Sequence, residues 1–163
     1  MPTVKKFVEV SVPVRTAYDQ WTQFEEFPQF MEGVEAVQQL DDKRLHWRAK
    51  VSGKVQEWDA EIYQQEPDRV IAWRSTSGSR NQGVVRFTPL DGDQTRIELE
   101  MHWEPQGVAE RVGDVMGADE MRIQGDLNRF KDFVESRGTP TGAWRGRIEG
   151  ERVEEDAGSG SRG

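Results

Sequence analysis

The sequence lacks cysteine and contains only two histidines, His46 and His102, among its 163 residues. Without cysteine the chain cannot form a disulfide framework, a thiolate nucleophile or a cysteine-ligated metal site. The two histidines fall on separate predicted strands and do not have the close spacing of a zinc-binding motif. No glycine-rich phosphate loop or dinucleotide fingerprint follows a predicted strand. We therefore expect neither a metal ion nor a cofactor.

Long apolar runs and clustered basic residues are also missing. No run approaches the roughly 20 apolar residues that a helix needs to cross a bilayer, and the N-terminal residues Met1 to Lys6 lack the apolar region of a signal peptide. These absences favour a cytoplasmic protein. The formal net charge is -8 and the isoelectric point is about 4.9. Because nucleic acids and anionic membranes select clustered lysine and arginine, neither is expected as the main partner.

What the chain does have is a set of large apolar side chains. Only 34% of its residues are hydrophobic and the mean hydropathy is -0.83, yet six residues are Trp and seven are Phe. A few large rings of this kind can fill a core or line a cavity. A chain of this length fits one domain with a core, followed by a tail.

The rings are most concentrated between Tyr18 and Met31. Five large apolar side chains fall close together in this stretch, namely Trp21, Phe24, Phe27, Phe30 and Met31. Pro28 interrupts the helical spacing, which predicts two short helices with a shared apolar side. Because this pair cannot bury so much aromatic surface against itself, a broad element is expected to lie across it.

Alternating apolar and polar residues predict that the broad element is an antiparallel sheet. A first strand is expected at Val4–Val12, with Lys6 as an exception on its apolar side, and about six more strands follow Gly33. In the five clearest strands the inward rows are large and uncharged, and across the sheet they supply Trp47, Trp58, Trp73, Phe87, Leu99, Met101 and Trp103. The outward rows hold both histidines, Arg74 and Arg86, with carboxylates on neighbouring strands, so structural pairing is expected there.

Beyond the strands, the apolar spacing changes to three and four residues. The segment Val108–Val134 is predicted to form a long amphipathic helix that ends near Gly138. The remaining segment Thr139–Gly163 is rich in Gly, Ser, Glu and Arg, and we expect a disordered polar tail. Within it, Trp144–Ile148 could dock on a protein partner or on its own domain.

Three stretches of the chain carry a family resemblance: Trp21–Met31, the strand Thr95–Leu99 and the helical segment Gly125–Lys131. Over residues 1–138 the chain resembles the START-like (SRPBCC) superfamily, and within it is similar to bacterial polyketide cyclase/dehydrase-like and coenzyme Q-binding proteins. The resemblance implies an α+β helix-grip fold, in which a curved antiparallel sheet of about seven strands wraps around a long C-terminal helix, with two short helices after the first strand. It also implies an elongated cavity between sheet and helix for lipids, quinones, polyketides or other apolar molecules.

Non-enzymatic binding of a small hydrophobic ligand in that cavity is the function we expect first. The candidate lining residues combine inward rings with apolar residues of the helices: Phe27, Phe30, Met31, Trp47, Trp58, Trp73, Phe87, Leu99, Met101, Trp103, Val112 and Met116. The competing interpretation is that the same rings simply fill the core, as buried aromatic side chains commonly do.

An aromatase or cyclase acting on a polyketide-like substrate is the alternative function, and a protein-binding adaptor is a third. A cyclase needs a positioned acid or base inside the cavity. The inward strand rows offer only Ser75 and Thr95, and neither is titratable. The remaining catalytic candidates are Asp119 and Glu120, which fill a gap in the apolar stripe of the long helix.

Overall fold

The protein is described by a computed structural model that covers residues 3–51, 53–78, 80–103 and 113–154, with backbone only for residues 51, 103 and 113–120. In chain order the elements are β1 (Thr3–Val10), α1 (Val14–Trp21), the 3-10 helix η1 (Phe24–Gln29), β2 (Val34–Gln39), β3 (Arg44–Val51), β4 (Lys54–Glu66), β5 (Val70–Gly78), β6 (Asn81–Leu90), β7 (Gln94–Trp103), α2 (Gly113–Arg137), β8 (Arg147–Glu149) and β9 (Arg152–Glu154).

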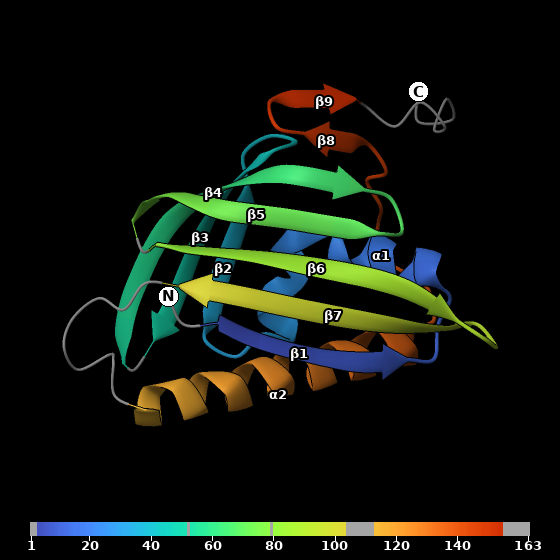
Figure 1. Cartoon of the computed structure of the whole chain (residues 1–163), viewed down its shortest axis with the longest axis horizontal. Helices are drawn as coiled ribbons and strands as arrows, with labels where there is room; N and C mark the ends of the chain where they lie inside the picture. The colour runs from blue at the N-terminus through green and yellow to red at the C-terminus, as the bar shows by residue number, and fades with distance from the viewer. Residues whose placement is uncertain (1–2, 52, 79, 104–112, 155–163) are drawn as a thin grey trace.

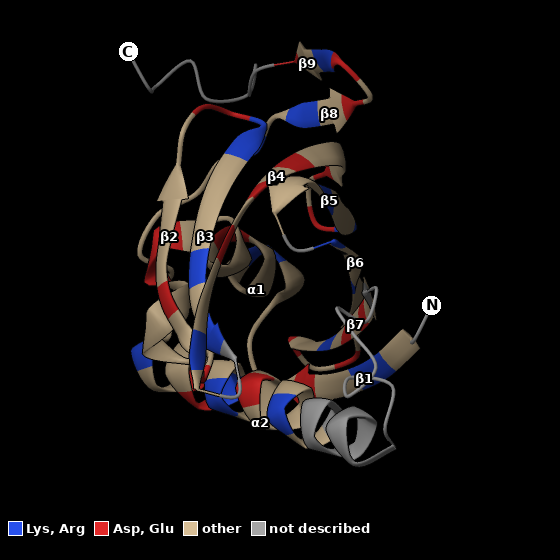
Figure 2. Cartoon of the chain, turned by 90° about the vertical axis from the view of Figure 1, so that its left-hand side faces the viewer, with Lys and Arg blue, Asp and Glu red and all other residues tan. Residues whose placement is uncertain are grey.

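Seven of these strands form one antiparallel sheet in the order β1-β7-β6-β5-β4-β3-β2, and the hairpin β8–β9 joins it through β4. The sheet curves around an interior, and α2 runs across its open side while α1 and η1 close one end (Figures 1 and 2). This arrangement is the α+β helix-grip fold that the sequence predicted.

Irregular pairing along β4 accounts for much of the curvature. Its register with β5 shifts between Asp59 and Ala60 and again between Ile62 and Gln64, and β2 has a further shift between Val34 and Ala36. Each such bulge bends its strand and increases the local twist. The sheet can therefore turn its large inward side chains toward one another instead of presenting a flat face.

The long helix α2 also covers the edge strand β1. Lys131 donates from Nζ to the carbonyl oxygen of Glu9 at 3.0 Å, and the backbone nitrogen of Ser11 donates to Oε2 of Glu135 at 2.6 Å. These contacts give partners to backbone groups at an edge that could otherwise pair with another chain. The predicted helix is confirmed from Gly113 onward, whereas its expected first residues, 108–112, lie outside the described residues.

The two short helices predicted between Tyr18 and Met31 are α1 and η1, but the chain turns before Pro28. The break falls at Thr22 and Gln23, where Oγ1 of Thr22 donates to the carbonyl oxygen of Asp19 at 2.6 Å and ends the first helix. Pro28 lies inside η1. A side-chain hydrogen bond that competes with the helical pattern therefore sets the boundary.

An aromatic cluster joins the short helices to α2. The ring centroids of Trp21 and Phe130 are 4.9 Å apart at an interplanar angle of 64°, and those of Phe30 and Phe130 are 5.1 Å apart at 72°. Phe27 lies beside Trp21, with centroids 5.5 Å apart. These edge-to-face contacts are the preferred geometry of aromatic pairs. All four rings are at most 2% exposed, so this end of the interior is solidly packed.

The prediction of a disordered tail is wrong for residues 139–154. Ile148 in β8 is fully buried, and Trp144 packs against the hydrophobic core. The guanidinium of Arg145 binds two carboxylates, with Nη1 at 2.5 Å from Oδ1 of Asp19 and Nη2 at 2.7 Å from Oδ2 of Asp68. The segment around Trp144 thus docks on its own domain. Residues 155–163 lie outside the described residues.

Candidate functional site

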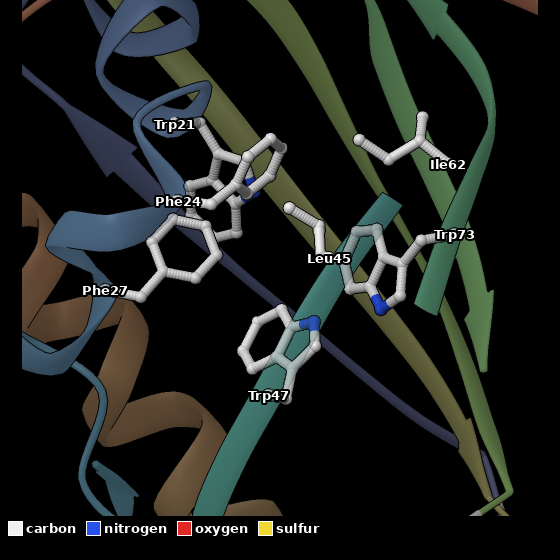
Figure 3. Close-up of a pocket in the computed structure, with 7 residues that line it drawn as sticks. All are labelled: Trp21, Phe24, Phe27, Leu45, Trp47, Ile62 and Trp73. Atoms are coloured by element: carbon white, nitrogen blue, oxygen red, sulfur yellow. The ribbon is translucent and has the colours of Figure 1, made fainter. Parts of the chain in front are cut away.

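The interior holds a small hollow between the short helices and the sheet (Figure 3). Its volume is about 10 Å³, close to the smallest space that holds one water molecule. Seven apolar or aromatic residues line it: Trp21, Phe24, Phe27, Leu45, Trp47, Ile62 and Trp73. Since none of the seven carries an acid or a base, the wall of the hollow supplies no group for proton transfer.

The lining residues come from two opposed surfaces. The end of α1 and the whole of η1 provide three rings, while β3, β4 and β5 provide the rest from the concave face of the sheet. Leu45 and Trp47 are two residues apart on β3, so both point inward, and Ile62 lies directly across from Trp73. The alternation of the strands therefore places these side chains.

A glycine makes room for one of the rings. A Cβ atom at Gly83 would lie 2.6 Å from Cζ2 of Trp73 and 2.7 Å from Sδ of Met101. Gly83 is the direct strand partner of both residues. The absence of a side chain there lets the indole of Trp73 lie against the backbone of β6.

Polar contacts from α2 hold the chain that follows η1. Nε of Arg129 donates to the carbonyl oxygen of Phe30 at 2.9 Å, and the backbone nitrogen of Glu32 donates to Oδ1 of Asp126 at 2.9 Å. Arg129 also forms an ion pair with Asp126, and burial raises the pKa of that carboxyl. These contacts fix Phe30 and Met31 between the sheet and the long helix.

The predicted lining residues fall into four groups. Phe27, Trp47 and Trp73 line the hollow, and Phe30, Phe87 and Leu99 are buried in the surrounding core. Met31, Trp58 and Met101 are half-buried. The side chains of Trp103 and Met116, and the whole of Val112, lie outside the described residues.

Four lining residues were absent from the prediction: Trp21, Phe24, Leu45 and Ile62. The first two belong to the ring-rich stretch, and the other two are on inward rows, so the signal for each was present in the sequence. The spacing of apolar residues does not reveal how β4 curves. This curvature determines which inward side chains come into contact.

The two hydroxyl groups predicted for the inner face already have hydrogen-bond partners. Oγ1 of Thr95 donates to the carbonyl oxygen of Val12 at 2.8 Å, and Oγ of Ser75 accepts from the backbone nitrogen of Asn81 at 3.0 Å. Lys6 is half-buried in the inward row of β1. The side chains of Asp119 and Glu120 lie outside the described side chains, so their proposed catalytic role stays a prediction.

The outer face of the sheet carries the two histidines and the predicted arginines, all in contact with carboxylates. Arg86 lies 3.3 Å from Oε1 of Glu100, and Arg74 lies 3.5 Å from Oε1 of Glu61. His102 also binds Glu100, at 2.9 Å. Acidic and basic positions are interspersed on the strands (Figure 2). These residues stabilise pairing between strands and stand apart from the hollow.

A cluster of polar side chains is buried where α1 meets the C-terminal segment. Nε2 of Gln65 donates to the hydroxyl of Tyr18 at 2.9 Å, and Arg145 lies over the Tyr18 ring at 5.4 Å from its centroid. Burial raises the pKa of the Tyr18 hydroxyl and that of the Asp19 carboxyl. Because Asp19 and Asp68 both contact Arg145, this group stabilises the docked segment.

A strongly curved antiparallel sheet that wraps around one long helix, closed at one end by two short helices, defines the START-like class of helix-grip proteins. The comparison of sequences agrees with the fold. The chain belongs to the family described as polyketide cyclase/dehydrase and lipid transport, which matches residues 10–132.

Similar proteins extend across most of the chain. A protein of Streptomyces lincolnensis, called the uncharacterized 17.2 kDa protein in the melC2-rnhH intergenic region, is 50% identical over 149 residues, which cover 91% of this chain and 99% of that protein. The Zhui aromatase/cyclase from Streptomyces sp. R1128 is 18% identical with a TM-score of 0.73, covering 83% of this chain and 94% of that one. A START superfamily protein from Mycobacterium smegmatis is 16% identical with a TM-score of 0.67, covering 83% and 98%. At these identities the two structures share the fold alone.

Among the described residues, no helix is long and apolar enough to cross a membrane. The same part of the chain contains no group of three or more potential side-chain ligands that could hold a metal ion.

Proposed function

We propose that the protein binds a small hydrophobic ligand, such as a lipid, quinone or polyketide, on the concave side of its sheet and does not transform it. The observation that carries this proposal is the hollow walled only by aromatic and aliphatic side chains. The lipid transport named in the family description supports the same function. An apolar wall favours an apolar ligand because burial removes both surfaces from water.

Ligand uptake requires the interior to open. Pockets that hold small molecules usually have volumes of about 300–1,000 Å³, whereas the hollow has about 10 Å³. The half-buried side chains of Met31 and Met101 are unbranched and adaptable. We propose that both methionines and Trp58 move away from the hollow when the ligand enters. Trp58 stacks on Trp47, with ring centroids 5.8 Å apart and an interplanar angle of 7°.

The alternative proposal is an aromatase or cyclase, and the fold shared with the Zhui aromatase/cyclase favours it. In this function Asp119 or Glu120 of α2 would act as the acid or base. Glu120→Gln would then lower turnover of a polyketide-like substrate by at least tenfold while leaving binding of an apolar probe unchanged. Equal turnover by the wild type and by Glu120→Gln would show that Glu120 takes no part in the reaction.

Uptake of N-phenyl-1-naphthylamine, a neutral apolar fluorophore, tests the ligand-binding proposal. Ile62→Phe adds a ring to the wall of the hollow and should weaken binding severalfold, because the added volume competes with the probe. Val55→Phe is the matched control, since Val55 is 45% exposed. Circular dichroism would establish that both variants are folded.

Solvent extraction of the purified full-length chain, followed by mass spectrometry, provides a test that needs no variant. The proposal predicts a co-purified apolar compound, or saturable binding of the fluorophore by the extracted protein. If the protein yields no such compound and does not bind the fluorophore, the proposal is wrong.

A further inference from the structure

The C-terminal segment, residues 139–154, lies beyond the family match, which covers residues 10–132. From the end of α2 it runs past α1 and ends in the β8–β9 hairpin, where β8 pairs with β4 (Figure 1). The family match therefore gives this segment no role, and its contacts must supply one.

The first residues of the segment hold the end of α1 and its link to η1. Nε2 of Gln20 donates to Oγ1 of Thr141 at 3.0 Å, and the backbone nitrogen of Thr141 donates to Oε1 of Gln20 at 2.9 Å. The backbone nitrogen of Trp144 donates to Oγ1 of Thr22 at 3.2 Å. The segment thus binds residues on both sides of Trp21 in the sequence.

These contacts bury the polar side of α1. Asp19 and Gln20 are 5% and 0% exposed, although such side chains usually lie in water. Asp19 pairs with Arg145, as Gln20 does with Thr141. Because hydrogen bonds and an ion pair join α1 to the segment, water can replace these partners when the segment leaves.

The rest of the segment is held by a small apolar contact and a short strand. Ile148 is fully buried and Trp144 is half-buried against the core. β8 has three residues and pairs with β4 at two positions. Segments with few buried apolar contacts open at a lower free energy than the core of a domain. The C-terminal segment can therefore detach while the sheet stays folded.

The junction that the segment holds supplies one wall of the hollow. Trp21 at the end of α1 and Phe24 and Phe27 of η1 line it, and Thr22 and Gln23 lie between the first two. The opposite wall belongs to β3, β4 and β5, each of which pairs with a strand on both sides. Because those strands are fixed by their neighbours, a hollow of about 10 Å³ gains most room when the short helices move.

We propose that the C-terminal segment is a clamp on the short helices, and that its release lets α1 and η1 move away from the sheet when a ligand enters. This inference rests on the proposed function, because it states how the proposed ligand gains room. While the segment is docked, its contacts keep Trp21 and Phe24 against the sheet. When it is released, the polar side of α1 becomes hydrated and the wall can shift.

A reversible disulfide between the clamp and the junction tests the inference. A Cβ atom at Gly142 would lie 2.8 Å from Cδ of Gln23, so the two positions face each other at contact distance. Since the chain has no cysteine, Gln23→Cys with Gly142→Cys introduces a single disulfide, which mass spectrometry would verify. Stopped-flow uptake of N-phenyl-1-naphthylamine should be about tenfold slower in the oxidised form than in the reduced form, because the tether depletes the open state.

A second cysteine pair is the matched control. Glu149 and Arg152 are direct partners in the β8–β9 hairpin. A disulfide formed by Glu149→Cys with Arg152→Cys ties the hairpin to itself and leaves the junction untethered. Oxidation and reduction of this protein should therefore give the same uptake rate.

Thr141→Val tests the clamp in the opposite direction. The substitution keeps the shape of the side chain and removes the hydroxyl that accepts from Gln20. Loss of one hydrogen bond should favour release and speed uptake about fivefold. Thr139→Val, at an exposed side chain of the same segment, should leave the rate unchanged.

Two kinds of failure are distinguishable. Equal uptake rates in the oxidised and reduced forms of the protein with cysteines at positions 23 and 142, or no acceleration by Thr141→Val, would overturn the clamp and leave ligand binding intact. If neither the wild type nor the reduced form takes up the fluorophore, ligand binding itself is contradicted.

Discussion

His46 lies between two carboxylates on the outer face of the sheet. Its Nδ1 is 2.6 Å from Oδ1 of Asp59 and its Nε2 is 2.8 Å from Oε1 of Glu57. The hydrogen bonds with Asp59 and then Glu57 raise the pKa of His46 above its ordinary value of 6.5. Both ring nitrogens can donate to these carboxylates only when the imidazole is protonated, so the contacts favour the charged form of His46.

The raised pKa of His46 gives a prediction with a definite sign. Protonated His46 stabilises the fold fully below pH 6.5, and this contribution is lost as the pH rises through the higher folded-state pKa. In an NMR titration His46 should titrate above 6.5, and Asp59→Asn should return its pKa toward that value. Asp93→Asn in the β6–β7 turn is the control. A folded-state pKa at or below 6.5 would contradict the assigned contacts.

At the scale of elements, the guanidinium of Arg145 is one of the contacts that hold the C-terminal segment. The side chains of Arg145 and Asp19 are only 13% and 8% exposed, so this ion pair is largely removed from water. Removing one partner of a buried pair costs more than the pair contributes, because the other charge stays buried without compensation. The contact therefore matters to the whole domain, although it joins residues 126 positions apart.

Arg145→Met should destabilise the protein by about 3 kcal/mol at pH 7. Burial already raises the pKa of Asp19, and loss of the cation raises it further, so protonation at low pH relieves the unpaired charge. The loss should accordingly be smaller at pH 4 than at pH 7 in urea unfolding. Arg152→Met, at a side chain 72% exposed, should change stability by less than about 0.5 kcal/mol. Equal stability of wild type and Arg145→Met at pH 7 would refute this account.

The sequence predicted the elements well where neighbouring residues determine them. Alternation located the strands around Trp47, Trp58 and Trp73, and the spacing of apolar residues located α2, because these patterns are local. Docking of Trp144–Ile148 on its own domain was only one of two alternatives, because Arg145 and Ile148 stand alone in a polar stretch. Their burial depends on partners far away in the sequence, which no local pattern reveals.

The candidate site could be predicted only in part, for a related reason. Inward orientation follows from alternation, so Trp47 and Trp73 on the strands were among the predicted lining residues, whereas Trp21 and Phe24 on the short helices were not. Which rings come into contact depends on the bulges of β4 and on the backbone at Gly83, against which Trp73 packs.

At the scale of the whole molecule, the sheet separates a charged outer face from an apolar concave face. Its outer face carries ion pairs, while its concave face carries mainly buried aromatic and aliphatic side chains. The helix α2 runs across the open side of the sheet (Figures 1 and 2). The chain thus has an apolar interior despite its low mean hydropathy of -0.83. The proposed binding of an apolar ligand on the concave side relies on this separation.

Methyl NMR during titration with N-phenyl-1-naphthylamine tests this account most directly. Binding on the concave side should shift the methyl resonances of Leu45 and Ile62, which line the hollow, and leave those of the exposed Leu40 and Val55 unchanged. Saturable shifts at the two inner residues are the predicted result. Shifts confined to Leu40, Val55 or other exposed methyl groups, with none at Leu45 and Ile62, would contradict a ligand site inside the sheet.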